Sequence, residues 1–207
     1  NSIYGNIKTR SANNIRFIWY KEFLKNNKSF SNILLIDIRD VYFQKNPFEF
    51  VQNKILVAQE DNCISNCPYN SDWIRSLYGE DVLKEMQNNP IYCAGTILGS
   101  REIIDELIEY EIMHMSQYKG DDKIIDQGIF NYFVFEKSEN CTINNNKTGS
   151  IYTMGYSNTF NFNKFGELIN NNNEPYAIIH QYDRYKWLAN YFTEKYKFDN
   201  FKKWLIF

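Results

Sequence analysis

The chain has 207 residues, a formal net charge of −2 and 43% hydrophobic residues, and its 16 Phe, 16 Tyr and four Trp require a buried core, which excludes a collagenous, coiled-coil or disordered chain. The acidic balance disfavours general nucleic-acid binding, which needs a basic face, and the longest apolar runs, such as residues 33–36, fall far short of the roughly 20 residues of a membrane-spanning helix. We therefore expect a single globular domain over residues 1–207, with no nucleic-acid partner and no transmembrane segment.

Apolar residues at helical or strand spacing predict alternating helices and strands. In chain order these are helix 11–25, strand 32–37, strand 54–59, loop 61–70, helix 72–86, strand 91–98, helix 100–116, helix 124–135, an Asn-rich stretch 140–173 with short strand-like pieces, strand 176–179 and helix 185–196. This alternation is typical of an α/β domain with a largely parallel sheet. Ligands of such sheets bind at the carboxyl ends of strands, so polar residues that follow a strand are the first candidates for a site.

The four cysteines, Cys63, Cys67, Cys93 and Cys141, are too few and too irregularly spaced for a disulfide scaffold. The pair Cys63 and Cys67 offers half of a zinc site, but no second Cys/His pair stands near it. The spacing favours a loop disulfide or free thiols, and it leaves the cellular compartment open.

Two carboxylates follow the strand predicted over residues 32–37. Asp37 and Asp40 at the mouth of a sheet would repel each other unless a cation such as Mg²⁺ or Mn²⁺ neutralised them. Positions i and i+3 of a regular strand face opposite ways, so the two converge only if the strand has ended at Asp37. The alternatives are an ion pair with Arg39 or a cap for the following turn.

His180 follows the last predicted strand. A histidine at this place is a candidate metal ligand, and the nearby Arg184 and Lys186 could hold a phosphate group. A structural histidine with satisfied hydrogen bonds is the alternative.

Taken together, these motifs make the chain similar to the GT-A nucleotide-sugar glycosyltransferases, in particular to the retaining enzymes of glycosyltransferase family eight and their relatives. The matching segments are Arg16-Phe17, Asp37-Ile-Arg-Asp40 with Pro47-Phe48, Cys93-Ala-Gly95, Asp126-Gln-Gly-Ile-Phe-Asn131 and His180 to Lys186. Their order and spacing agree over nearly the whole chain. The resemblance implies a GT-A fold, with a mostly parallel mixed sheet, helices on both faces, and N-terminal strands that lie upstream of residue 1.

The resemblance also implies roles for single residues. Asp37, Asp40 and His180 would be the ligands of Mn²⁺ or Mg²⁺, and their carboxylate and imidazole donors suit Mn²⁺. The residues that would bind the nucleotide-sugar donor, expected to be a UDP-sugar, are Arg16, Asp37, Ala94, Gly95 and Lys186. Of the catalytic residues, Asp126 and Gln127 would line the sugar site, and Lys186 would neutralise the departing diphosphate. The implied reaction transfers a sugar, with retention, to a hydroxyl of a glycan, glycolipid or glycoprotein.

The chain departs from the family pattern at four places. The segment from Asp37 to Asp40 has one residue more than Asp-x-Asp, Cys93 replaces an Asn, Gly128 replaces an Asp, and no Pro follows Lys186. The changes at Cys93 and Gly128, together with the expected N-terminal strands upstream of residue 1, leave open a catalytically inactive, glycosyltransferase-like binding module. A phosphatase of the haloacid-dehalogenase type is disfavoured, because it requires an Asp where Arg39 stands.

Overall fold

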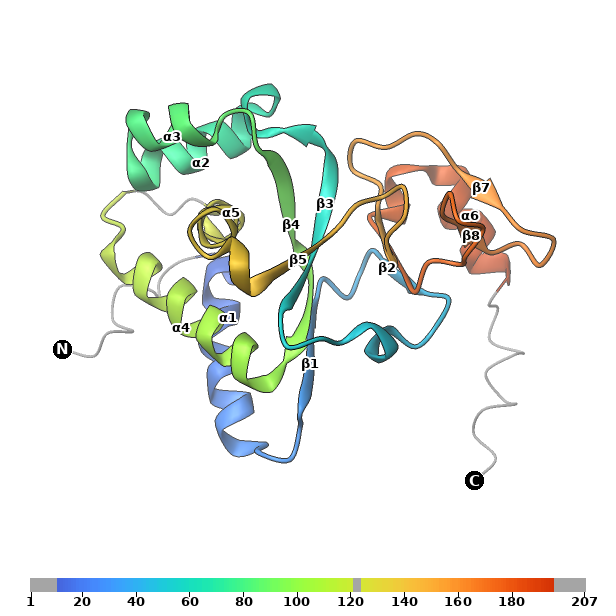
Figure 1. Cartoon of the computed structure of the whole chain (residues 1–207), viewed down its shortest axis with the longest axis horizontal. Coiled ribbons are helices and arrows are strands. Elements are labelled where there is room, and N and C mark those ends of the chain that lie inside the picture. Colours follow the sequence, from blue (N-terminus) through green and yellow to red (C-terminus); the bar gives the residue numbers. More distant parts are fainter. Residues whose placement is uncertain (1–10, 121–123, 196–207) are drawn as a thin grey trace.

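A four-stranded mixed sheet lies at the centre of the computed structural model, which describes residues 11–120 and 124–195 (Figure 1). Its strands follow the order β1 (Asn32–Ile36), β4 (Pro90–Ser100), β3 (Ile55–Cys63) and β5 (Cys141–Asn144). Within this sheet β4 runs antiparallel to both of its neighbours, and β3 pairs with β5 in parallel. The α/β class is therefore confirmed, but the expectation of a mostly parallel sheet is wrong. Apolar runs report burial on both faces of a sheet, and they carry little information on strand direction.

Helices cover one face of this sheet (Figure 1). They are α1 (Ala12–Asn26), α2 (Pro68–Tyr78), α3 (Glu80–Met86), α4 (Arg101–Gln117) and α5 (Asp126–Glu136). Phe17 of α1, Ile104 of α4 and Phe130 of α5 are fully buried in one cluster with Ile55 and Ile97 of the sheet. Burying side chains of this size contributes roughly 1.5–3 kcal/mol each, so the packing of this layer stabilises the sheet from one side.

A second sheet covers the opposite face. Its three strands lie in the order β2 (Val41–Phe43), β9 (Ile178–His180) and β6 (Ile151–Thr153). The side chains that pack between the two sheets include Leu56, Ala58, Leu98, Ile151 and Ile178. The expectation of helices on both faces is therefore corrected: among the described residues, α6 (Lys186–Lys195) is the one α-helix on this side, packed through Leu188 and Phe192 in a cluster that contains Ile179 of the second sheet. The strands of the second sheet have three residues each, which is too short for a clear periodic pattern.

Most predicted helices and strands agree with the observed ones to within a few residues, but three segments differ. The predicted loop 61–70 is the end of β3, a 3-10 turn (Ile64–Asn66) and the start of α2. The predicted helix 72–86 is split into α2 and α3 by Gly79, whose φ of 90° no helix allows. β2 was not predicted, and Tyr196 of the predicted last helix lies outside the described residues.

The remaining elements are short. They are a ribbon of β7 (Asn161–Phe162) and β8 (Leu168–Ile169) and three 3-10 turns, Pro47–Phe50, Ser138–Asn140 and Tyr182–Arg184. Among the described helices, none combines the length and the apolar character that crossing a bilayer requires. All four cysteines are free thiols, which is one of the two expected alternatives.

Candidate metal centre

The end of β1 places the two predicted carboxylates. Ile36 pairs with Thr96 of β4, and the Asp37 amide then donates a hydrogen bond of 2.9 Å to the carbonyl oxygen of Gly95. The strand ends here, and residues 37–40 form the turn that leads into β2. Because the regular strand has ended, the side chains of Asp37 and Asp40 can point to one place. This is the condition under which the two carboxylates can bind the same ion.

The pairing of β2 with β9 brings His180 to the same place. In this antiparallel pair His180 lies opposite Val41, the residue that follows Asp40. The Gln181 amide also donates a hydrogen bond of 2.8 Å to the Asp40 carbonyl oxygen. Two hydrogen-bonded strands of the second sheet therefore hold Asp40 and His180 side by side, although 140 positions separate them in the sequence.

Asp37, Asp40 and His180 each turn one ligand atom toward the others, and these three atoms lie within 4.8 Å of one another. The Nε2 atom of His180 is 3.9 Å from Asp37 Oδ2 and 3.7 Å from Asp40 Oδ1. These distances exceed a hydrogen bond, and they match two ligand atoms bound about 2.1 Å from one ion, which lie roughly 3–4 Å apart. The three residues predicted as metal ligands are thus brought together in a group that could hold a metal ion.

His180 supports this fit by its own environment. Its side chain is 1% exposed, and Nε2 has no hydrogen-bond partner among the described residues. An unpartnered buried ring nitrogen is unfavourable unless something binds it. Burial lowers the pKa of His180, although Asp40 and Asp37 oppose this shift, so the ring is neutral near pH 7 and keeps a lone pair for an ion.

Gly95 has no side chain, and His180 and Asp37 occupy the space where its Cβ atom would lie. A Cβ atom at this position would lie 2.4 Å from Cε1 of His180 and 2.6 Å from Oδ2 of Asp37. Contacts this short do not occur for real side chains, so only glycine is compatible with the arrangement. Gly95, predicted to bind the donor, thus directly adjoins the predicted metal ligands.

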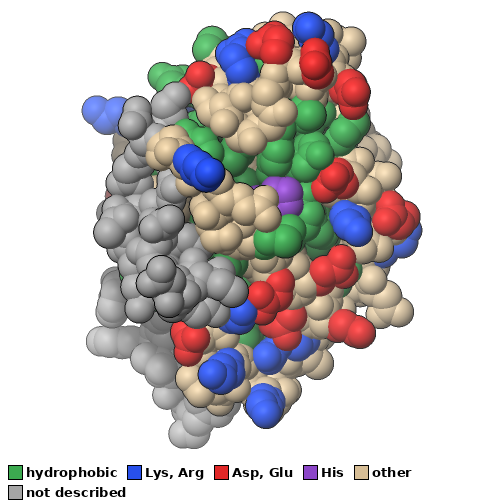
Figure 2. Space-filling view, turned by 90° about the vertical axis from the view of Figure 1, so that its left-hand side faces the viewer, with side chains coloured by type: hydrophobic (Ala, Val, Ile, Leu, Met, Phe, Trp, Pro, Cys, Tyr) green, Lys and Arg blue, Asp and Glu red, His purple; other side chains and the backbone are tan. Residues whose placement is uncertain are grey.

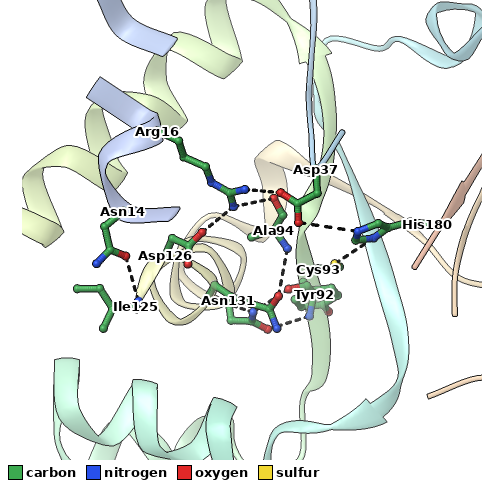
Figure 3. A network of polar contacts seen from close by, with 11 residues as sticks. Asn14, Arg16, Asp37, Tyr92, Cys93, Ala94, Ile125, Asp126, Asn131 and His180 are labelled. Carbon is green, nitrogen blue, oxygen red and sulfur yellow. Dashed lines mark hydrogen bonds and ion pairs between the residues drawn. The ribbon is translucent and has the colours of Figure 1, made fainter. Parts of the chain in front are cut away.

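Arg16 of α1 joins the cluster to the start of α5 (Figure 3). Its Nη1 lies 2.6 Å from Asp37 Oδ1, and its Nη2 lies 2.6 Å from Asp126 Oδ2 and donates to the Ala94 carbonyl oxygen at 3.2 Å. Burial by itself would lower the pKa of Arg16, but Asp126 and Asp37 raise it above its usual value, so the guanidinium stays charged. Arg39 is exposed and forms none of the ion pairs of the described residues, so Arg16 and not Arg39 pairs with the carboxylate of Asp37.

Gln127 follows Asp126 and is held at both ends of its amide. Its Oε1 accepts a hydrogen bond from the Ala94 amide at 3.5 Å, and its Nε2 donates to Asn70 Oδ1 at 3.1 Å. Asn70, buried at the start of α2, was not identified from the sequence, because an Asn in a predicted loop carries no signal. Asp126 is itself 2% exposed, and its carboxylate forms an ion pair with Arg16. Little of this carboxylate is therefore accessible to a ligand.

Lys186 is the one predicted site residue that stands apart. It is the first residue of α6, its side chain is exposed, and no hydrogen bond or ion pair within the described part of the chain links it to the cluster.

Cys93 and Glu60 lie behind His180, and neither was predicted from the sequence as a site residue. The Cys93 thiol lies 3.5 Å from Nδ1 of His180, and burial together with the charge of Glu60, which is 4% exposed, raises the pKa of this thiol. Glu60 lies within the run of apolar residues that forms β3. A charged residue in a buried strand is unusual, so the sequence did contain a signal for Glu60.

A separate cavity of about 740 Å³ opens between α2, α4 and α5, and no residue of the cluster lines it. Figure 2 shows this face, where a histidine lies among hydrophobic side chains with acidic groups around them. Tyr110 stacks on His114 and Tyr78 stacks on Tyr132, so the rings that line the cavity already pack on one another.

Comparisons of the chain with models of protein families and with curated proteins give no match.

Proposed function

We propose that the chain is a divalent-metal-dependent glycosyltransferase, which moves a sugar from a nucleotide-sugar donor, a UDP-sugar, to a hydroxyl of a glycan or glycoconjugate with retention. The observation that carries the proposal is the meeting of five separate segments at one point. Arg16, Asp37, Gly95, Asp126 and His180 come from five segments that each carry a motif of the glycosyltransferase pattern, and each contacts or adjoins another of the five. A chance likeness of short motifs would have no reason to converge in space.

The chemistry of the cluster suits a diphosphate leaving group. Two carboxylates and an imidazole are donors that suit Mn²⁺, and the carboxylate oxygens also suit Mg²⁺. Bound there, such an ion would supply positive charge to the diphosphate as the glycosidic bond breaks.

Asp37 has a double role in this proposal, because its two oxygens face different partners. Oδ1 is held at 2.6 Å by Arg16, and Oδ2 faces His180. Arg16 is held in turn by Asp126, so it fixes the direction of Oδ2 and leaves it free for the ion. Gln127, fixed between Ala94 and Asn70, is only partly buried and would line the sugar site.

Lys186 would neutralise the departing diphosphate from the start of α6, where its exposed side chain is free to reach a bound donor. Because the diphosphate gains charge mainly in the transition state, Lys186→Ala is expected to lower kcat more than donor affinity. The measurement is a comparison of kcat with the dissociation constant of the donor. A loss confined to affinity would remove Lys186 from this role.

Thermal denaturation with UDP, with and without Mn²⁺, tests the function. A ligand present at 100 times its dissociation constant stabilises the native state by about 2.7 kcal/mol, which is readily measured. We expect stabilisation by UDP that requires Mn²⁺ in the wild type and is absent in Asp40→Ala. The matched control is Asp183→Ala, which removes an exposed carboxylate near Asp40 but outside the cluster and should retain the shift.

Three outcomes would overturn the proposal or part of it. Equal shifts in the wild type and Asp40→Ala would refute the metal site. Stabilisation by Mn²⁺ that UDP does not increase would leave a metal site without a nucleotide donor. Binding of UDP and Mn²⁺ without transfer to any saccharide acceptor would favour the inactive binding module.

A further inference from the structure

Exposed aromatic rings lie together where the ribbon of β7 and β8 packs against α6, on the side of the molecule away from the layer of α1 to α5 (Figure 1). The ring centroid of Phe162 on β7 is 6.3 Å from that of Trp187 and 5.5 Å from that of Tyr191, both on α6. Phe162 is 37% exposed, Trp187 is 50% exposed, and Phe165, between β7 and β8, is 69% exposed. Exposed apolar residues that adjoin one another, unlike scattered ones, are typical of an interaction surface.

The turn between β7 and β8 places Phe165 at an exposed tip. The Gly166 amide donates a hydrogen bond of 3.0 Å to the Asn163 carbonyl oxygen, and the Phe165 amide donates one of 2.9 Å to Asn163 Oδ1. These bonds close a tight turn around Lys164 and Phe165. Such positions favour Gly, Asn, Asp or Ser, and a ring that stays in water adds little to the stability of the fold. Phe165 is therefore better explained by binding than by folding.

Contacts with α6 hold this turn in place. The Gly166 carbonyl oxygen accepts hydrogen bonds of 2.6 Å from the Tyr191 hydroxyl and from Lys195 Nζ. Gly166 has a φ of 71°, and a Cβ atom at this position would overlap the Tyr191 hydroxyl, so the close approach requires glycine. The exposed rings therefore belong to a preformed surface, with the turn fixed against the helix.

Lysines accompany these rings. The Nζ atom of Lys164 lies 5.1 Å from the centroid of the Phe165 ring, and that of Lys195 lies 5.7 Å from the centroid of the Tyr191 ring. The lysines of residues 161–169 and 186–207 are Lys164, Lys186, Lys195, Lys197, Lys202 and Lys203. The acids of the same two stretches are Glu167, Glu194 and Asp199. Because the whole chain has a net charge of −2, this excess of lysines is a local feature.

Aromatic rings next to lysines are the combination that binds the surface of an anionic bilayer. The rings enter the boundary between headgroups and acyl chains, and the lysines attract anionic headgroups. A saccharide is the competing partner, because aromatic rings also stack on sugars. The planes of Phe162 and Trp187 meet at 61° and form no flat platform, and a neutral glycan has no use for the lysines. The chemistry of the surface therefore favours a membrane.

We propose that this aromatic–lysine patch, defined by Phe162, Lys164, Phe165, Trp187 and Lys195, docks the protein on a membrane surface that contains anionic lipids. The inference goes beyond the proposed function and does not depend on it, because the patch shares no residue with the group that could hold a metal ion.

Sedimentation with lipid vesicles tests the proposal on the full chain. We expect binding to vesicles of phosphatidylcholine with about one third phosphatidylglycerol, weaker binding to phosphatidylcholine alone, and a loss of binding as the salt concentration rises. Lys164→Glu and Phe165→Ser should each weaken binding at least about fivefold, the factor that one lysine near an anionic surface typically contributes. The matched controls are Lys84→Glu on α3, with a side chain 63% exposed, and Phe23→Ser on α1, where Phe23 is 58% exposed.

Several results would overturn the proposal. They are the absence of wild-type binding to the anionic vesicles, equal losses in the controls, and unchanged binding in both patch variants. A loss confined to Lys202→Glu with Lys203→Glu would move the contact to residues 196–207. Patch variants that bind vesicles normally but lose affinity for a saccharide acceptor would identify a glycan surface instead.

Two further measurements separate docking from folding and from the proposed function. The midpoint of thermal unfolding of each variant should stay near that of the wild type, because the side chains of Lys164 and Phe165 are exposed. If Phe165→Ser fails to fold, Lys164→Glu decides by the same sedimentation. The patch variants should also keep the stabilisation by UDP with Mn²⁺. If the wild type lacks that stabilisation but binds vesicles, the proposed function fails and the docking surface stands.

Discussion

Arg16 pairs with two carboxylates beside the cluster. Its guanidinium lies between Asp37, which is partly exposed, and Asp126, whose side chain is 3% exposed. An isolated buried carboxylate is strongly unfavourable. Replacing both Arg16 and Asp126 should therefore lower the free energy of unfolding less than replacing Arg16 alone.

A double-mutant cycle tests this pairing. Arg16→Met should lower the free energy of unfolding by about 3–5 kcal/mol, because it leaves Asp126 buried without a counter-charge. Asp126→Leu alone should also destabilise, but Arg16→Met with Asp126→Leu should cost less than the sum of the two. Urea denaturation of the four proteins measures the coupling, and strict additivity would contradict the assignment.

Gly95 offers a second test at the residue scale. In Gly95→Ala the new methyl group would overlap the ring of His180 and the carboxylate of Asp37, so one of them must move. We expect Mn²⁺ affinity, measured by calorimetry, to fall at least about tenfold. Gly99→Ala, on the same strand, is the control, because its methyl group would meet Ile103 and Ile104 of α4; equal losses in both variants would argue against a local effect.

At the scale of elements, the break between α2 and α3 shows how one backbone angle divides a predicted helix. Gly79 has φ 90° and ψ 176°, a conformation that is essentially restricted to glycine. The side-chain pattern on either side is helical, which is why a single helix was predicted over residues 72–86.

Gly79→Ala should lower the free energy of unfolding by about 1–3 kcal/mol through backbone strain alone. No atom lies within 4 Å of the added methyl group, so a steric clash cannot be the cause. Asp81→Ala is the control, because its side chain is 97% exposed and surface changes of this kind have small effects. Urea denaturation compares the two, and equal stability of Gly79→Ala and the wild type would show that the break relaxes without strain.

At the scale of the whole molecule, buried acids make stability depend on pH. Burial raises the pKa of Glu60 from 4.5 to about 7, and it raises the pKa of Glu111, fully buried on α4, well above its usual value. The folded protein therefore keeps protons that the unfolded chain releases above pH 4.5. The stability that these groups contribute is fully present below pH 4.5 and is lost as the pH rises toward the pKa of the folded state.

For Glu60 the loss between pH 4.5 and 8 amounts to about 3 kcal/mol. Glu60→Gln removes this titration, so the free energy of unfolding should fall less between pH 5 and pH 8 in the variant than in the wild type. Denaturation by urea at the two pH values measures the difference. The same fall in both proteins would mean that Glu60 titrates normally in the folded state.

The sequence by itself determined most helices, four of the strands and the identity of the polar residues at their ends. Apolar spacing within about ten residues is a local property, and it was sufficient to place Asp37 directly after β1 and His180 at the end of β9. The motifs that follow the strands also predicted the residues that meet in the cluster.

Only the tertiary structure decided how strands pair and which groups stand behind the cluster. Strand direction and the three-residue strands β2 and β6 depend on hydrogen bonds between distant segments, which no local pattern encodes. The contacts of Arg16 with Asp126 and of Cys93 with Glu60 likewise join residues from different elements. Helix and strand formation follow from neighbours in the chain, whereas the orientation of a buried ring or carboxylate follows from neighbours in space.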